Sequence, residues 1–377
     1  MNRIVTFGEI MGRITPQGFK RFTQTDQFEI TYGGAEANTG ISLANFGERV
    51  SHVTKFPDND LGTAALRTLM AHGVDVSYVA RGGERLGMYY YERGASQRGA
   101  KVIYDRKYSS IATATPADFD WDAVFEGADW FHWTGITPAL SAGCAEILLQ
   151  ACRAAHAHGV TVSCDVNYRA NLWSVQEAGR IMTDLMPFVD VAIANEEHCQ
   201  KLFGITPDDP ALSGTPEGYA QVARKLSGRF AVPTVVITVR KGRDATENSV
   251  SALMLQNGSL VSSRAYDVRI VERIGGGDAL SAGLIYALRR PADRYDIILP
   301  GAASRLPHRL FCGLPHGGQP VVRHLAGDDD GVDIQLVDDI RRIGERSANP
   351  DAADIPPLEI DVVVQQPDDH PVIGGRR

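Results

Sequence analysis

VERIGGGDALSAGLIYAL, residues 271–288, places three consecutive glycines before an aspartate, at the start of a segment with helical character. Backbone N–H groups at a helix N-terminus lack partners within the helix, and with the positive end of the helix dipole they attract anions. Gly275, Gly276 and Gly277 therefore predict an anion-binding turn, and Asp278 adds a negative charge to it. Two interpretations are open. Asp278 is a helix cap in a tight turn, or it accepts a proton from a hydroxyl group that attacks a phosphoryl group held by the glycine amides.

Composition restricts the class of protein. The chain of 377 residues is 44% hydrophobic and carries a formal net charge of -8. It has no cluster of Lys and Arg interleaved with aromatics, so no nucleic-acid partner is expected. No apolar run has the length of a membrane span, and the N-terminal MNRIVTFGEI lacks the apolar core of a signal peptide. Five cysteines without a C-x-x-C pair are typical of reduced thiols in a cytoplasmic protein.

Strand-like and helix-like segments alternate through the middle of the chain. Strand-like apolar runs occupy 128–136, 160–166, 189–195 and 233–239, and segments with helical spacing occupy 141–159, 175–186 and 216–229. This alternation predicts a parallel sheet with helices on both faces. In such a sheet, ligands bind beyond the carboxyl ends of the strands.

Two other stretches have a different pattern. Residues 28–38 (FEITYGGAEAN) and 85–106 are rich in aromatics and in alternation with period two. They predict a small antiparallel flap, with lid strands from about 12–36 and 86–108, apart from the main sheet. From residue 327 to residue 377 the chain is acidic and rich in proline, which predicts a loosely ordered tail.

Four motifs in a fixed order carry a resemblance to a known family. GGDALSAG (276–283) resembles the signature of the PfkB family of carbohydrate kinases, which have the ribokinase-like fold. YGGAEANTGISLANFG resembles the sugar-binding glycines of that family, with Gly33, Gly34 and Asn38 in the matching places, and FPDNDLG and NEEHCQKLFG follow the family order. Each motif alone also fits a tight turn or a helix cap. The resemblance implies an α/β fold, with a Rossmann-type sheet flanked by helices and a small β-flap lid.

The resemblance covers residues 1–290, and it is specific to one group of family members. Six further stretches resemble the members that act on 2-keto-3-deoxygluconate: TFGEIMGRITP, GMYYYERG, VIYDRKYSS, HWTGITPALS, CDVNYRANLWS and VITVRKG. This likeness implies that the sugar acid contacts Gly34, Tyr89, Tyr104, Arg106 and Arg169. Their chemistry agrees, because guanidinium groups bind carboxylates through paired donors and tyrosine hydroxyls bind polyols. The alternative is that Arg169 is a surface charge and that the tyrosines form the packing face of an edge strand.

The resemblance also implies a nucleotide site. Asn195 ends a predicted strand, where the family usually has Asn-x-x-Glu, which organises Mg²⁺ and phosphate through water. Here His198 holds the fourth position, and Glu197 becomes the candidate for a metal contact through water. The residues expected to bind ATP are Asn195, Arg240, Gly242, Gly275 and Gly277.

The family pattern is interrupted after the first 299 residues, which form the predicted kinase domain. Family members continue with helices against the adenine, whereas residues 300–326 contain four prolines and three histidines without helical or strand periodicity. Within this aberrant segment, 300–324 resembles a stretch read in another frame, and Pro307, Pro315 and Pro320 would break any helix. We predict a defective adenine wall, weak ATP affinity and marginal stability.

The sequence thus predicts a kinase that uses ATP and Mg²⁺ to phosphorylate the 6-hydroxyl of 2-keto-3-deoxy-D-gluconate, with Asp278 as base. One rival is another kinase of the family, acting on fructose, ribose or a keto-gluconate. Arg106 and Arg169 favour an acid, because a neutral sugar leaves their charges unpaired. The other rival is a catalytically impaired sugar-binding homologue. The sugar acid and ATP are the expected partners, with a homo-oligomer through the lid strands as a further option. The epimer and a potassium requirement stay open.

Overall fold

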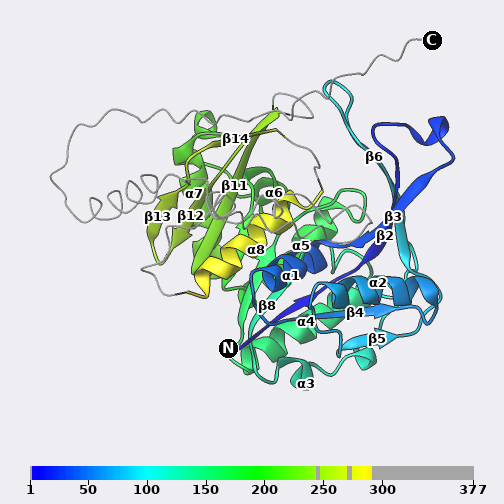
Figure 1. Ribbon diagram of the computed structural model, residues 1–377. Coiled ribbons are helices and arrows are strands. Elements are labelled where there is room, and N and C mark those ends of the chain that lie inside the picture. The colour runs from blue at the N-terminus through cyan, green and yellow to red at the C-terminus, as the bar shows by residue number, and fades with distance from the viewer. Residues whose placement is uncertain (1, 243–246, 270–273, 291–377) are drawn as a thin grey trace, which may run out of the picture. The chain divides into compact units, whose positions relative to one another are not determined.

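The computed structural model describes residues 2–242, 247–269 and 274–290, which contain two β-sheets and eight α-helices (Figure 1). The strands of the main sheet are β1 (Arg3–Phe7), β4 (Val50–Phe56), β5 (Val79–Arg81), β8 (Ala128–Thr134), β9 (Thr161–Asp165), β10 (Val191–Ala194), β11 (Thr234–Gly242), β12 (Glu247–Gln256), β13 (Ser259–Ser262) and β14 (Tyr266–Arg269). The helices are α1 (Ala35–Asn45), α2 (Asp60–Ala71), α3 (Trp121–Phe125), α4 (Ala142–Ala157), α5 (Val175–Leu185), α6 (Glu196–Phe203), α7 (Pro216–Phe230) and α8 (Gly276–Leu288). The predicted segments at 300–326 and 327–377 lie outside the described residues.

The main sheet confirms the predicted α/β class. Its order is β13-β12-β11-β10-β9-β8-β1-β4-β5, and the strands from β11 to β5 are all parallel. The four strands predicted in the middle of the chain are β8, β9, β10 and β11. The antiparallel strands β12, β13 and β14 at the other side of β11 were not predicted.

Helices cover both faces of the main sheet. One apolar cluster joins the sheet to α1, α2 and α8, and another joins it to α3, α4, α5, α6 and α7. Figure 1 shows α1 beside α8. Because both faces are covered, β1 is buried along its whole length. Each fully buried side chain of Leu or Phe size contributes about 1.5–3 kcal/mol, so these two clusters hold the helices on the two faces of the sheet.

Helix α4 illustrates how local sequence sets the ends of an element. Ser141 caps it by accepting a hydrogen bond from the Cys144 N–H at 3.1 Å. The chain leaves the helix through Gly159, whose φ of 67° suits glycine. The face with Ile147 and Leu148 is fully buried. This confirms the helix predicted over 141–159.

The second sheet is the predicted lid. It has the order β3-β2-β6-β7, formed by β2 (Met11–Pro16), β3 (Phe28–Gly33), β6 (Gly87–Glu92) and β7 (Lys101–Asp105). The pairs β2–β3 and β6–β7 are antiparallel, but β2 and β6 pair in parallel. A wholly antiparallel flap was therefore wrong. The reason is that β2 follows β1 and β6 follows β5, so both enter the lid from strands that run in the same direction.

Candidate active site

The N-termini of α1 and α8 meet at the carboxyl edge of the main sheet. The side-chain amide of Asn38 donates to Asp278 Oδ2 at 2.7 Å, and Thr39 Oγ1 donates to the backbone oxygen of Asp278 at 3.3 Å. These residues lie about 240 positions apart in sequence. The structure thus brings together two residues that were predicted separately.

Asp278 is the third residue of α8 and does not cap it. Gly275 occupies the N-cap position with a φ of 92°, in the region that favours glycine. Burial, with a smaller contribution from the nearby Asp165, raises the pKa of Asp278 to about 7, and the hydrogen bond from Asn38 opposes the shift. A carboxyl group with this pKa changes protonation state near neutral pH, as a general base requires.

The glycines of the predicted anion cradle lie at the start of α8. Gly276 and Gly277 are exposed in the first turn of α8, and no side chain caps the helix. Within the described part of the chain, no acceptor is found for the N–H groups of Gly276 and Gly277, whereas the N–H of Asp278 is bonded to its own carboxylate. Free donors at the positive end of a helix suit an anionic oxygen such as that of a phosphate.

Asp165 is a site residue that sequence reasoning missed. It ends β9, and a Cβ added at Gly277 would lie 3.9 Å from its Oδ2 atom. Burial raises its pKa to about 6, against a hydrogen bond that Oδ1 accepts from the Asn167 N–H at 3.1 Å. The available signal was an acidic residue at the carboxyl end of a predicted parallel strand, where ligands of such sheets bind.

Arg169 lies close to these two carboxyl groups. Its positive charge lowers the pKa of both Asp165 and Asp278. The side chain is exposed, and within the described residues its guanidinium group forms no hydrogen bond. Arg169 is therefore available for an anionic ligand.

Three predicted sugar-binding residues gather on the lid. The ring centroids of Tyr89 and Tyr104 are 6.1 Å apart, and Arg106 Cζ lies 5.6 Å from the centroid of the Tyr104 ring. Tyr89 is buried, whereas Tyr104 is 42% exposed. The lid thus combines aromatic rings with one cation, an arrangement suited to a polar ligand that carries negative charge.

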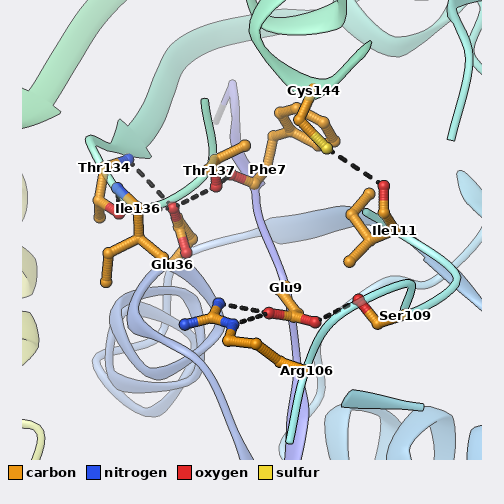
Figure 2. Close-up of polar contacts among 10 residues, drawn as sticks. All are labelled: Phe7, Glu9, Glu36, Arg106, Ser109, Ile111, Thr134, Ile136, Thr137 and Cys144. Atoms are coloured by element: carbon orange, nitrogen blue, oxygen red, sulfur yellow. Dashed lines mark hydrogen bonds and ion pairs between the residues drawn. The ribbon is translucent and has the colours of Figure 1, made fainter. Parts of the chain in front are cut away.

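The charge of Arg106 is already paired inside the protein (Figure 2). Its Nε atom donates to Glu9 Oε2 at 2.7 Å, and Nη2 donates to the same oxygen. Ser109 Oγ donates to Glu9 Oε1 at 2.6 Å. Sequence reasoning missed Glu9. The premise that a neutral sugar would leave the charge of Arg106 unpaired was therefore wrong, because Glu9 already pairs with it.

A second buried acid fixes the start of α1 (Figure 2). Glu36 Oε1 accepts hydrogen bonds from Thr134 Oγ1 at 2.8 Å, Thr137 Oγ1 at 2.7 Å and the Thr134 N–H at 3.1 Å. Burial nevertheless raises the pKa of Glu36 to about 7. Gly8 leaves room for this carboxyl group, because a Cβ there would overlap Glu36 Oε2. Glu36 thereby ties the turn between Gly34 and Asn38 to the loop after β8.

The two glycines predicted to contact the sugar have different positions. Gly33 ends β3 and pairs with Met11 of β2. Gly34 is the N-cap of α1, and its φ of -166° is open to any residue. Glycine is required there by space, because a Cβ would overlap the backbone oxygen of Glu9.

Gly34→Ala is expected to destabilise the protein, since it forces the start of α1 away from Glu9. Overpacking of this kind typically costs about 1–3 kcal/mol, occasionally more. The control is Gly228→Ala on the exposed face of α7, where an added Cβ meets nothing within 4 Å. That change is expected to stabilise the fold by about 0.5–1 kcal/mol through helix propensity. Urea unfolding of both variants measures the difference, and equal stabilities would contradict the steric argument.

The predicted nucleotide residues are more dispersed. Asn195 caps α6, where its Oδ1 atom accepts from the His198 N–H at 2.7 Å. Glu197 is exposed and forms an ion pair with Lys201, one turn further along the helix. Burial lowers the pKa of His198 to about 4, so its ring is neutral near pH 7.

Two further residues that were predicted to bind the nucleotide lie on the antiparallel pair β11–β12. Arg240 Nε donates to Asn248 Oδ1 at 2.8 Å, and Gly242 is paired with Asn248 at the end of β11. Arg240 and Gly242 are both exposed. Their contact with a nucleotide stays a prediction.

The described residues contain neither a cluster of metal ligands nor a membrane-spanning helix. No group of three or more His, Cys, Asp and Glu side chains with the geometry of a metal site is found among them. Within the same residues, no helix combines the length and apolar character needed to cross a membrane.

Comparison with known proteins supports these observations. The profile described as pfkB family carbohydrate kinase matches residues 1–304. The crystal structure of a 2-dehydro-3-deoxygluconokinase from Thermotoga maritima is 45% identical, with a TM-score of 0.77, and the match covers 80% of this chain and 91% of that one.

Two named relatives are similar in sequence. The 2-dehydro-3-deoxygalactonokinase of Haloferax volcanii is 32% identical over 336 residues, which are 88% of this chain and 98% of the relative. The 2-dehydro-3-deoxygluconokinase of Bacillus subtilis is 28% identical over 301 residues, which are 79% of this chain and 87% of the relative. With the lid, the parallel sheet and the glycine turn at α8, these matches establish that the chain belongs to the pfkB family of carbohydrate kinases.

Proposed function

We propose that the protein transfers the γ-phosphoryl group of ATP to the 6-hydroxyl group of 2-keto-3-deoxy-D-gluconate. The observation that carries the proposal is the placement of Asp278, with a pKa near 7, in the first turn of a helix that begins with the free amides of Gly276 and Gly277. Phosphoryl transfer depends mainly on positioning, on stabilisation of charge and on a base near the attacking oxygen. The names of similar relatives supply the substrate class.

In this proposal the two ends of the motif act on different reactants. Asp278 accepts the proton of the sugar hydroxyl, and Asn38 holds the carboxylate in position through its hydrogen bond. The amides of Gly275, Gly276 and Gly277 bind the phosphoryl oxygens. The acid therefore faces the sugar and the glycines face the phosphate.

The sugar acid is proposed to lie between the lid and the start of α1. Gly33, Gly34 and Asn38 are placed on one side, and Tyr89, Tyr104 and Arg106 on the lid. Arg169 is proposed to bind the carboxylate of the substrate, since its guanidinium group has no hydrogen-bond partner among the described residues. A neutral sugar gives that charge no partner, which favours an acid.

ATP and Mg²⁺ are proposed as cofactors. Asn195, Arg240 and Gly242 are proposed on the nucleotide side, with Glu197 as a contact to the metal through water. Mg²⁺ is commonly held by one or two carboxylates, waters and the phosphates of the substrate, so a site without a dedicated cluster of ligands fits it. When bound, the ion neutralises charge on the phosphates. Residues 300–324, where we predicted a defective adenine wall, lie outside the described residues, and weak ATP affinity stays a proposal.

An ATP-dependent phosphorylation assay over a panel of substrates tests the proposed function. The panel contains 2-keto-3-deoxygluconate, its galacto epimer, keto-gluconate, fructose and ribose, since the relatives are named for both epimers. The highest kcat/KM is expected for a 2-keto-3-deoxy acid. Preference for fructose or ribose would replace the substrate assignment, and binding of sugar acid without turnover would identify an impaired homologue.

The pH dependence of kcat/KM is expected to follow the protonation of Asp278. Only its carboxylate form accepts a proton, so activity rises with pH through an apparent pKa near 7 and levels above it. At pH 6 about a tenth of the plateau remains. Initial rates between pH 5.5 and 9 measure this limb. The residual activity of Asp278→Asn serves as control and is expected to lack it; an unchanged limb in that variant would assign the pKa to another group.

We also propose an oligomeric state and a cellular location. Exposed apolar side chains on the lid strands, including Phe28, Ile30, Val102 and Ile103, support a homo-oligomer formed through the lid. Analytical ultracentrifugation measures the oligomeric state.

The four described cysteines are buried and unpaired, which supports a cytoplasmic location.

A further inference from the structure

The lid is joined to the main sheet by four passages of the chain. They are residues 8–10 between β1 and β2, Gly34 between β3 and α1, residues 82–86 between β5 and β6, and the segment that follows β7 at Arg106. Besides the packing of β3 and β6 side chains against the main body, these four connections set the position of the lid relative to the start of α1.

Glu9 is in contact with all four passages. It lies on the first, and its backbone oxygen excludes a Cβ at Gly34 on the second. Its carboxylate excludes a Cβ at Gly87, where the third passage enters β6. It accepts hydrogen bonds from Arg106 and Ser109 on the fourth. The Glu9 side chain is only 1% exposed, so it is enclosed by protein groups.

The pairing leaves part of Arg106 unused. Nε and Nη2 donate to Glu9, whereas Nη1 donates to no group among the described residues. Guanidinium is planar with donors in a fixed fork, so holding one edge sets the direction of the other. The same guanidinium lies over the ring of Tyr104, which in turn lies beside Tyr89.

We propose that Glu9 is a positioning residue for the kinase reaction. Its hydrogen bonds fix the direction of the Nη1 edge of Arg106. They thereby hold the Tyr89–Tyr104 face of the lid in a fixed position relative to Gly34 at the start of α1. The inference rests on the proposed function, because the ligand that these surfaces share is the sugar acid. Glu9 itself is enclosed by protein groups and acts through Arg106.

The test compares Glu9→Gln with Glu48→Gln. Glu48 is also a buried acid, 7% exposed, paired with Arg289 and Arg290. It precedes β4, at the amino edge of the sheet, whereas Glu9 follows β1 at the carboxyl edge. Both variants remove a buried negative charge that forms an ion pair with arginine, so both are expected to have a lower free energy of unfolding than the wild type. Only the first disturbs the junction of lid and sheet.

The Glu9→Gln variant is expected to raise KM for the sugar acid roughly 10–100-fold, because small misplacements of binding groups have effects of this order. KM for ATP is expected to change less than about twofold, since the nucleotide side does not involve the lid junction. Glu48→Gln is expected to leave both constants near wild type. Equal changes in the two variants would show that Glu9 has a structural role only and would overturn the inference.

A double-mutant cycle tests whether Glu9 acts through Arg106. If it does, adding Glu9→Gln to Arg106→Gln changes KM by less than about twofold, because the two effects are coupled. Independent, multiplicative effects would overturn the inference. Ser109→Ala provides a milder change should Glu9→Gln fail to fold. It removes one hydrogen bond to Glu9 Oε1 and is expected to raise KM for the sugar acid about 2–10-fold; an unchanged KM would count against the inference.

Hydrogen exchange separates this inference from the proposed function. In the absence of any substrate, amides of β6 and β7 are expected to exchange faster in Glu9→Gln than in Glu48→Gln, because only the first frees the lid. If the wild-type protein phosphorylates no sugar acid, the proposed function fails while this comparison still decides whether Glu9 fixes the lid. Equal exchange in both variants would overturn the inference whatever the activity.

Discussion

Replacement of Asp278 by Asn is expected to lower kcat by roughly 10²–10⁴, the usual contribution of a general base. The change preserves the size of the side chain but removes the proton acceptor. Asn can still accept a hydrogen bond from Asn38, so the contact between α1 and α8 survives. Binding of the sugar acid, measured by calorimetry, is expected to change little.

The stability of the same variant gives the control. Burial and the neighbouring Asp165 disfavour the ionised form of Asp278, as its raised pKa shows. At pH 8 the wild-type carboxyl is ionised at a cost, and Asn removes that cost. The melting temperature at pH 8 is therefore expected to equal or exceed that of the wild type. A variant with near-normal kcat would reduce Asp278 to a structural role.

Arg169→Ala and Arg106→Ala are expected to have different effects, although the sequence placed both arginines on the sugar acid. Arg169 is exposed, and its loss is expected to raise KM for the acid about 10–150-fold, if it makes a charged hydrogen bond worth roughly 1.5–3 kcal/mol. Its effect on stability is small. Loss of Arg106 leaves the carboxylate of Glu9 buried without its partner, which costs about 3–5 kcal/mol of folding stability.

Urea unfolding and steady-state kinetics of the two variants measure this contrast. Neutral sugars serve as the control ligands and are expected to bind Arg169→Ala no worse than wild type. Equal losses for acidic and neutral sugars would show that Arg169 has no role in recognition of the carboxylate. An Arg106→Ala protein as stable as the wild type would contradict the importance of the Glu9–Arg106 pair.

The fold was predictable where local pattern and packing agree. The strand β8 and the helix α4 have clear apolar periodicity and clear end signals, and the structure confirms both. The parallel pairing of β2 with β6 had no local signal, because it follows from the direction in which two distant strands leave the main sheet. Pairing between remote segments depends on tertiary topology, which a single sequence does not display.

The candidate site shows the same division. The glycine turn before Asp278 was found because it concentrates several rare residue types in one short stretch. Glu9, Glu36 and Asp165 lie within stretches that carry the family resemblance, but they were missed because each is a single acid with no neighbouring residue that marks its role. Their importance lies in partners about 100 positions away, such as Arg106 for Glu9 and Thr137 for Glu36. The residue type of an acidic side chain does not show whether distant partners bury it.

The junction at Glu9 also limits how substrate range can change by recombination. The lid is assembled from two separate lengths of chain, about residues 8–35 and 82–111, and their contacts meet at one carboxylate. A chimera that imports only the second segment from a relative combines the relative's residues around position 106 with the Glu9 of this chain. The buried Glu9 carboxylate is then expected to lack a guanidinium group placed to pair with it. Lids of this construction are therefore exchanged as a matched pair of segments, so single-crossover chimeras that divide the pair are expected to be recovered less often than double-crossover ones.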